Sequence, residues 1–104
     1  MQHIENLVLS SVEMVEESSI LIFFNSEWQQ ENIHQLAKLV FAQLPGAMEI
    51  EHVQGADRES IRIQWQQGFF VLNFECYSQS CWLEAEDEAS REKLSLLHLQ
   101  LVNN

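Results

Sequence analysis

Apolar and polar residues alternate along most of the second half of the chain, and this pattern predicts a meander of four β-strands. The expected strands are about Met48 to Val53, Ile61 to Trp65, Phe69 to Tyr77 and Ser80 to Glu86. Tight turns are expected at 66–68, where Gly68 can take a positive φ, and at Ser78-Gln79. One face of these strands is apolar and the other polar, as in antiparallel sheets with one packed side.

The first part of the chain predicts two more strands, at about Ile4 to Leu9 and Ile20 to Phe24. The pattern leaves open whether Val12 to Val15 extends the first of them. The second run is apolar without alternation, which is typical of an interior strand with both faces covered at least in part.

Two helices complete the pattern. Apolar residues at helical spacing predict one from about Glu27 to Leu44, with Ser26 as N-cap and Gln29 as its capping-box partner. The second is expected from about Glu88 to Val102, with Asp87 as its N-cap. The order ββ-α-ββββ-α predicts an α+β fold, a two-layer sandwich with two helices on one face of a mostly antiparallel sheet. The 104 residues are expected to form a single domain, 1–104.

Charge narrows the choice of partners. The chain has 16 acidic residues against 5 Lys and Arg, a formal net charge of -11, while 46% of it is hydrophobic. The apolar content is sufficient for a core, so the charge lies on the surface of a folded domain. Such a surface repels phosphate backbones and anionic headgroups, so we expect neither nucleic acid nor membrane as a partner.

The N-terminus shows no cationic and apolar targeting pattern, and the longest apolar run, Ile20 to Phe24, is too short to cross a bilayer. We therefore expect a cytoplasmic protein with reduced thiols. If Ser78-Gln79 is a two-residue turn, Cys76 and Cys81 face each other across a hairpin at disulfide distance. The simpler interpretation is two inert thiols on the core face, and a redox pair is the alternative.

The sequence contains no catalytic motif, metal-ligand spacing, phosphate-binding loop or cofactor fingerprint, so no catalytic residue, metal or cofactor is predicted. His52 shares strand parity with Met48 and Ile50, and it is a candidate for a partly buried, hydrogen-bonded histidine. The acidic stretch 84–88 is interpreted as a solvated face followed by a helix start.

A possible interaction patch remains. Several aromatic and apolar side chains have the parity opposite to the core, or lie off the apolar stripe of the closing helix. These residues are Phe69, Val71, Tyr77, Trp82, Leu96 and Leu99. Aromatic patches rimmed by acids are typical of protein contact surfaces.

The strand segments Phe74-Glu75-Cys76 and Trp82-Leu83-Glu84, with the closing leucine-rich helix, resemble one of the short bacterial families known only as domains of unknown function. This resemblance implies a small single-domain bacterial protein and carries no activity. The chain is also similar in size and charge to acidic secretion chaperones, but those begin with a helix and this chain is expected to begin with a strand.

The leading hypothesis is therefore a non-enzymatic protein-binding or regulatory module. The first alternative is a small enzyme or ligand-binding domain with a cleft between sheet and helices, lined by His52 and nearby carboxylates. The second is a homodimer that buries its own apolar surface.

Overall fold

The structure is a computed structural model, and it describes residues 7–102. The predicted order of two strands, a helix, four strands and a closing helix is confirmed, with the closing helix divided into α2 and α3. In chain order the elements are β1 (Leu9–Val15), β2 (Ser19–Phe24), the 3-10 turn η1 (Gln30–Asn32), α1 (Ile33–Ala42), β3 (Met48–Gln54), β4 (Arg58–Trp65), β5 (Gly68–Glu75), β6 (Ser80–Ala85), α2 (Glu88–Arg91) and α3 (Leu94–Val102).

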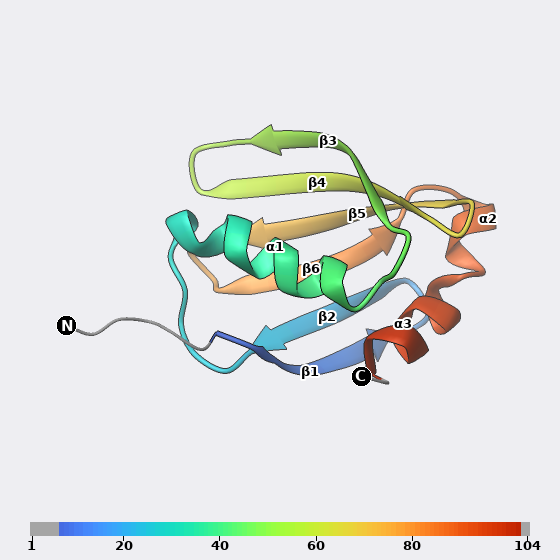
Figure 1. Cartoon of the computed structure of the whole chain (residues 1–104), viewed down its shortest axis with the longest axis horizontal. Coiled ribbons are helices and arrows are strands. Elements are labelled where there is room, and N and C mark those ends of the chain that lie inside the picture. The colour runs from blue at the N-terminus through green and yellow to red at the C-terminus, as the bar shows by residue number, and fades with distance from the viewer. Residues whose placement is uncertain (1–6, 103–104) are drawn as a thin grey trace.

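The strands form one antiparallel sheet in the order β1-β2-β6-β5-β4-β3. The helices α1 and α3 lie over the same face of this sheet (Figure 1). The predicted two-layer α+β sandwich is therefore confirmed. The β1–β2 hairpin pairs with β6, which leaves β1 and β3 as the two edges.

The core lies between the sheet and the helices. Alternate residues of β4, β5 and β6 point into it, and Ile63, Phe70 and Leu83 each have 0% exposure. Leu36 of α1 and Leu97 of α3, also 0% exposed, belong to the same core cluster. Full burial of one such side chain contributes about 1.5–3 kcal/mol, so this face of the sheet is the main source of stability.

The second strand is covered on one face only. Ile20 and Ile22 of β2 are buried, whereas Phe23 on the opposite face is 41% exposed. The strand is interior to the sheet, between β1 and β6, as its apolar run indicated. The expectation that both of its faces are covered is correct only in part.

The prediction for the first strand was wrong in position. The strand β1 runs over Leu9–Val15, where the pattern had offered only a possible extension. The predicted start at Ile4 lies outside the described residues, and Leu7 is buried without belonging to a strand. A register shift between Leu9 and Ser11 breaks the alternation that would have revealed β1.

The helix α1 begins later than predicted, and its cap differs. Ser26 does not cap it: its Oγ donates to the carbonyl oxygen of Glu27. Instead Gln29 and Asn32 form a reciprocal capping box around η1, in which Asn32 Oδ1 accepts from the Gln29 N–H at 2.8 Å. The prediction for Asp87 is confirmed, because its carboxylate accepts from the N–H of Ser90 at 2.8 Å.

The β4–β5 turn uses positive φ at unexpected positions. Trp65 pairs with Gly68, so Gln66 and Gln67 alone form the turn, with φ of 51° and 66°. The prediction that Gly68 takes the positive φ was wrong. A glycine is required there for space, because a Cβ would lie 2.9 Å from the ring of Phe70.

Candidate binding surface

The sheet face opposite the helices, called the open face below, presents alternate side chains of all six strands. Its middle row runs across β2, β6, β5, β4 and β3. The strand pairing places five side chains next to one another there, namely Leu21, Trp82, Asn73, Ser60 and Val53. Three of the five are apolar, although none of the helices in the described part of the chain lies over this face (Figure 1).

A second row of the open face mixes charge with apolar surface. Glu84 of β6, Val71 of β5, Arg62 of β4 and Glu51 of β3 lie next to one another. Phe69 lies two residues before Val71 on the same strand face, half-buried like Val71 and Trp82. The open face therefore carries partly exposed aromatic and aliphatic groups on interior strands of a rigid sheet.

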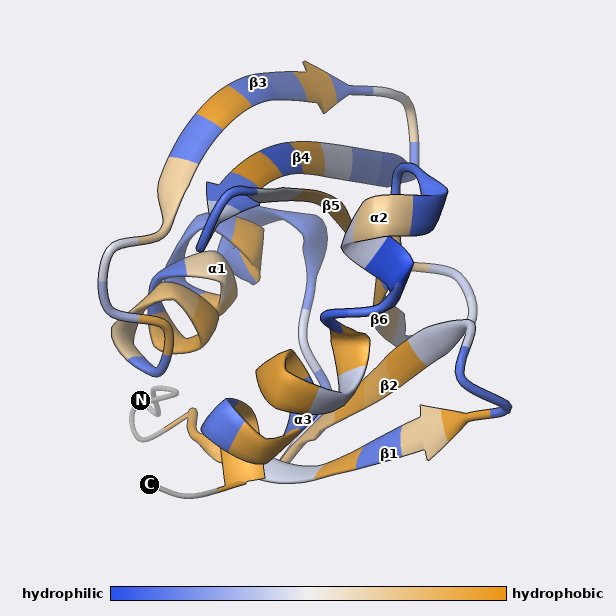
Figure 2. Ribbon diagram, turned by 90° about the vertical axis from the view of Figure 1, so that its right-hand side faces the viewer, coloured by the Kyte–Doolittle hydropathy of each residue, from blue (hydrophilic) through white to orange (hydrophobic). Residues whose placement is uncertain are grey.

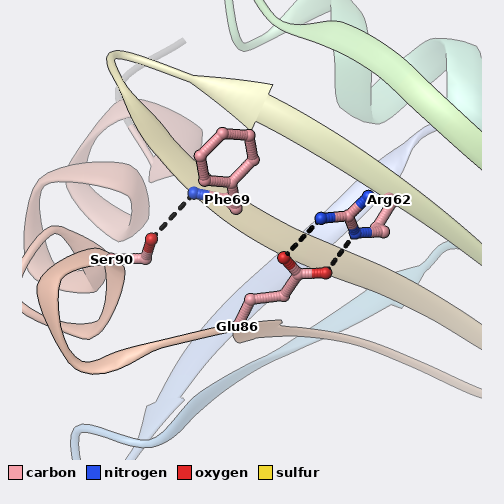
Figure 3. A network of polar contacts seen from close by, with 4 residues as sticks. All are labelled: Arg62, Phe69, Glu86 and Ser90. Carbon is pink, nitrogen blue, oxygen red and sulfur yellow. Dashed lines mark hydrogen bonds and ion pairs between the residues drawn. The ribbon is translucent and has the colours of Figure 1, made fainter.

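Two arginines lie over the aromatic rings. The guanidinium carbon of Arg58 is 5.4 Å from the Trp82 ring centre, and that of Arg62 is 5.9 Å from the Phe69 ring centre. Arg62 also donates from Nη2 to Glu86 Oε1 at 2.9 Å and from Nε to the other carboxylate oxygen (Figure 3). The hydrogen bond to Glu86 raises the pKa of Arg62. A cation–π contact of this kind stabilises the approach of a guanidinium to a ring by about 0.5–1 kcal/mol at exposed sites.

Asn73 anchors the centre of the open face. It is only 3% exposed, and its Oδ1 accepts from Ser60 Oγ at 2.9 Å. Its Nδ2 lies 3.4 Å from both Glu84 Oε2 and the carbonyl oxygen of Val71, and donates to each. A buried amide with satisfied partners fixes neighbouring side chains. The open face is therefore pre-organised.

The structure separates the predicted interaction patch into different surfaces. Phe69, Val71 and Trp82 lie together on the open face. Tyr77 lies in the β5–β6 turn and is 88% exposed. The remaining two residues, Leu96 and Leu99, are 46% and 54% exposed on α3, which packs against β1 and β2 in the helix layer.

The two cysteines do not face each other, so the predicted hairpin register was wrong. Cys81 pairs with Phe74, because the turn covers the four residues 76–79 and Gln79 takes a φ of 58°. Both thiols are free. Burial raises the pKa of Cys81 well above its ordinary value, and burial followed by the charge of Asp57 raises that of Cys76. Neither thiol is activated as a nucleophile.

His52 forms the one contact at hydrogen-bond distance that the described residues show between a histidine and a carboxylate. Its Nε2 lies 2.6 Å from Glu59 Oε2, and Glu59 is only 6% exposed. The sequence indicated a hydrogen-bonded His52 but not its partner. The sequence does contain a sign of this partner. Glu59 shares strand parity with Ile61 and Ile63, so its side chain points to the packed side of β4.

Three hollows in the surface lie away from this pair. One of about 500 Å³ lies between the β1–β2 turn and α2, and one of about 310 Å³ lies between β1 and the end of α3. A smaller hollow of about 110 Å³ lies on the open face between Val53 and Val71. Neither His52 nor Glu59 lines any of these three.

Within residues 7–102, no group of three or more His, Cys, Asp or Glu side chains is arranged to hold a metal ion. The helices in this range are also too short or too polar to cross a membrane.

Comparison with known proteins identifies a family. Residues 9–102 match the family described as "Protein of unknown function (DUF3630)". The chain belongs to the DUF3630 family. This confirms the resemblance to a short family of unknown function, and the DUF3630 match includes every strand of the sheet. No curated protein and no solved structure matches the chain.

Proposed function

We propose that this DUF3630 domain is a non-enzymatic protein-binding or regulatory module that contacts its partner through the open face. The observation that carries the proposal is that Phe69, Val71 and Trp82 share one face of interior strands and are half-exposed there. Arg62 lies over the ring of Phe69, and Arg58 lies over the ring of Trp82. Aromatic side chains on a rigid scaffold lose little conformational entropy on binding, and they are enriched at protein interfaces.

Charge indicates the kind of partner. Arg58 and Arg62 are the basic residues of the open face within the described range, and Arg62 is already paired with Glu86. The acidic residues that rim or cross this face are Glu13, Glu51, Glu75, Glu84 and Glu86. A partner with a basic rim would associate faster through electrostatic steering, and salt would slow the association.

The proposal includes a cytoplasmic location and a bacterial origin. A cytoplasmic location agrees with two free thiols whose raised pKa values keep them protonated and slow to oxidise. A bacterial origin rests on the resemblance of the strand segments and the closing helix alone.

The test is affinity capture from the native host with three forms of the chain as bait. The first is the wild type, the second is Phe69→Ser/Trp82→Ser on the open face, and the control is Leu96→Ser/Leu99→Ser on α3. We expect the wild type and the control to retain the same protein at low salt, and the open-face variant to lose it. Equal retention by all three would refute the open face as the docking surface. Urea unfolding of each bait verifies that it is folded.

Two alternatives have distinct signatures. Homodimerisation through the open face predicts a mass that rises with concentration in light scattering and returns to that of the monomer in the Trp82→Ser variant. A ligand-binding or catalytic role is favoured by the His52–Glu59 pair alone. A small-molecule screen by NMR that selectively shifts the signals of these two residues would support it.

A further inference from the structure

We propose that β3 accepts an extended, lysine- or arginine-rich segment of a partner protein as a seventh strand of the sheet. This inference rests on the proposed protein-binding function and names the binding mode and the chemistry of the segment. It places the contact on the edge of the sheet, next to the open face.

The strand β3 is an edge of the sheet, and within residues 7–102 its side chains are exposed. All seven of its residues are exposed, including Met48 at 59%, Ile50 at 41% and Val53 at 55%. Figure 2 shows hydrophobic and hydrophilic segments alternating along β3, with the helices lying over other strands. An edge strand leaves every second N–H and C=O group without a strand partner, which is the template that an added strand uses.

The template is already formed. The strand β3 pairs with β4 from Met48 to Gln54, and the contact between His52 and Glu59 at 2.6 Å joins the two strands through their side chains. The register shift between Glu49 and Glu51 interrupts the regular ladder there. Residues 51–54 are regular, so we place the added segment along them.

The charge of β3 favours a basic segment as the added strand. The strand contains Glu49 and Glu51 and no Lys or Arg. Arg62, which lies opposite Glu51 on β4, is held by Glu86. A second copy of β3 would bring the same glutamates close to one another, and like charges across a strand pair are destabilising. A basic segment gains from the same two carboxylates.

The faces of β3 define a sequence pattern in the partner. Glu51 and Val53 both point to the open face, because they pair with Arg62 and Ser60. An added strand therefore places a basic side chain beside Glu51 and an apolar side chain beside Val53, two residues apart. The apolar side chain would extend the open face past Val53, next to the hollow between Val53 and Val71.

The experiment uses synthetic peptides of about nine residues, a common strand length. Every second residue is threonine, and the positions between the threonines are lysine and valine in turn, so that lysine and valine lie two residues apart. Binding to the full chain is followed by NMR at low salt. We expect shifts at residues 51–54 and slower hydrogen exchange at alternate amides of that stretch. A peptide with glutamate in place of lysine should bind at least about tenfold more weakly, because like charges repel. A peptide N-methylated along one edge should also bind more weakly, since it cannot donate to the strand.

A charge reversal with a matched control tests the selectivity. Glu51→Lys should reverse the preference, so that the glutamate peptide binds better than the lysine peptide. Glu13→Lys, on the opposite edge strand and the same face, should leave the preference unchanged. If both variants weaken the lysine peptide equally, the effect is that of net charge and the proposal is overturned.

Other outcomes overturn it as well. These are no binding of the lysine peptide at millimolar concentration, shifts centred on Trp82 in place of β3, or self-association through β3 in light scattering. The capture experiment tests the proposed function separately from the β3 site. The Trp82→Ser variant should still bind the peptide. If the Phe69→Ser/Trp82→Ser bait keeps the captured partner while the peptide still binds at β3, the open face is refuted and the β3 site remains.

Discussion

The β4–β5 turn holds two glutamines in the left-handed region of the backbone. Gln66 and Gln67 both have positive φ, and the pairing of Trp65 with Gly68 leaves them as the whole of a two-residue turn. Turns of this kind favour Asn followed by Gly, because these residues tolerate the left-handed region. We therefore predict that Gln66→Asn/Gln67→Gly stabilises the fold.

The size of the effect follows from opposing contributions. A residue with an ordinary side chain costs roughly 1–2 kcal/mol in the left-handed region. A new glycine at position 67 removes this cost but also makes the unfolded chain more flexible, which offsets about 0.5–1 kcal/mol. Both glutamine side chains are exposed, and the Lys93 Nζ contact at 3.0 Å is to the carbonyl oxygen of Gln66, which the substitution keeps. The net gain is about 1 kcal/mol, or roughly 4–8 °C in Tm.

The measurement is urea unfolding followed by tryptophan fluorescence. Gln64→Gly, in the extended backbone of β4, is the control and should lose about 0.5–1 kcal/mol in the free energy of unfolding. A turn variant that is no more stable than the wild type would show that the left-handed residues carry no strain here. Equal losses in the two variants would contradict the backbone assignment.

Three further predictions concern side chains. In native protein, Cys76 should be alkylated faster than the buried Cys81, and both more slowly than after unfolding, as read by mass spectrometry of the modified peptides. Gln79→Ala should lower the free energy of unfolding in urea by about 1–2 kcal/mol, because the amide of Gln79 both donates to and accepts from the backbone of Trp28, at 2.7 and 2.9 Å. Hydrogen bonds from the neighbouring helix start hold the pKa of Asp87 below its ordinary 3.8, so its stabilising effect is present above that pH and is lost as the pH falls through the lowered value. The stability difference between wild type and Asp87→Asn, measured by thermal unfolding, should therefore disappear in acid, and a difference that persists unchanged there would contradict this assignment.

The sequence predicted the elements best where periodicity was unbroken. From Ile61 to Ala85 alternate residues face the core, and one-sided burial requires that alternation. The strand β1 was misplaced because the register shift near Ser10 interrupts the period, while Leu7 to Leu9 offered a more continuous apolar run. Local patterns cannot show how many residues a turn uses. The prediction that Cys76 and Cys81 face each other required a two-residue turn, whereas the turn has four residues.

The candidate surface was predicted in part. Strand parity identified Phe69, Val71 and Trp82 as lying opposite the core, and this parity is what brings them together. It could not show that Leu96 and Leu99 belong to another surface, because their position depends on how α3 crosses β1 and β2. The exposure of β3 also depends on strand order, which pairs distant segments and leaves no trace in local composition.

The strand order has a consequence for how the molecule assembles. The strands β3 to β6 are neighbours both in sequence and in the sheet. Each of them can therefore pair with the next by closing only a short loop. The β1–β2 hairpin joins them only through residues 19–21 against 82–84, across more than half the chain. The meander should therefore form early and the hairpin should attach last, together with α3. Until it does, β6 is a temporary free edge, and this is the stage at which a crowded or overheated solution would cause the chain to aggregate.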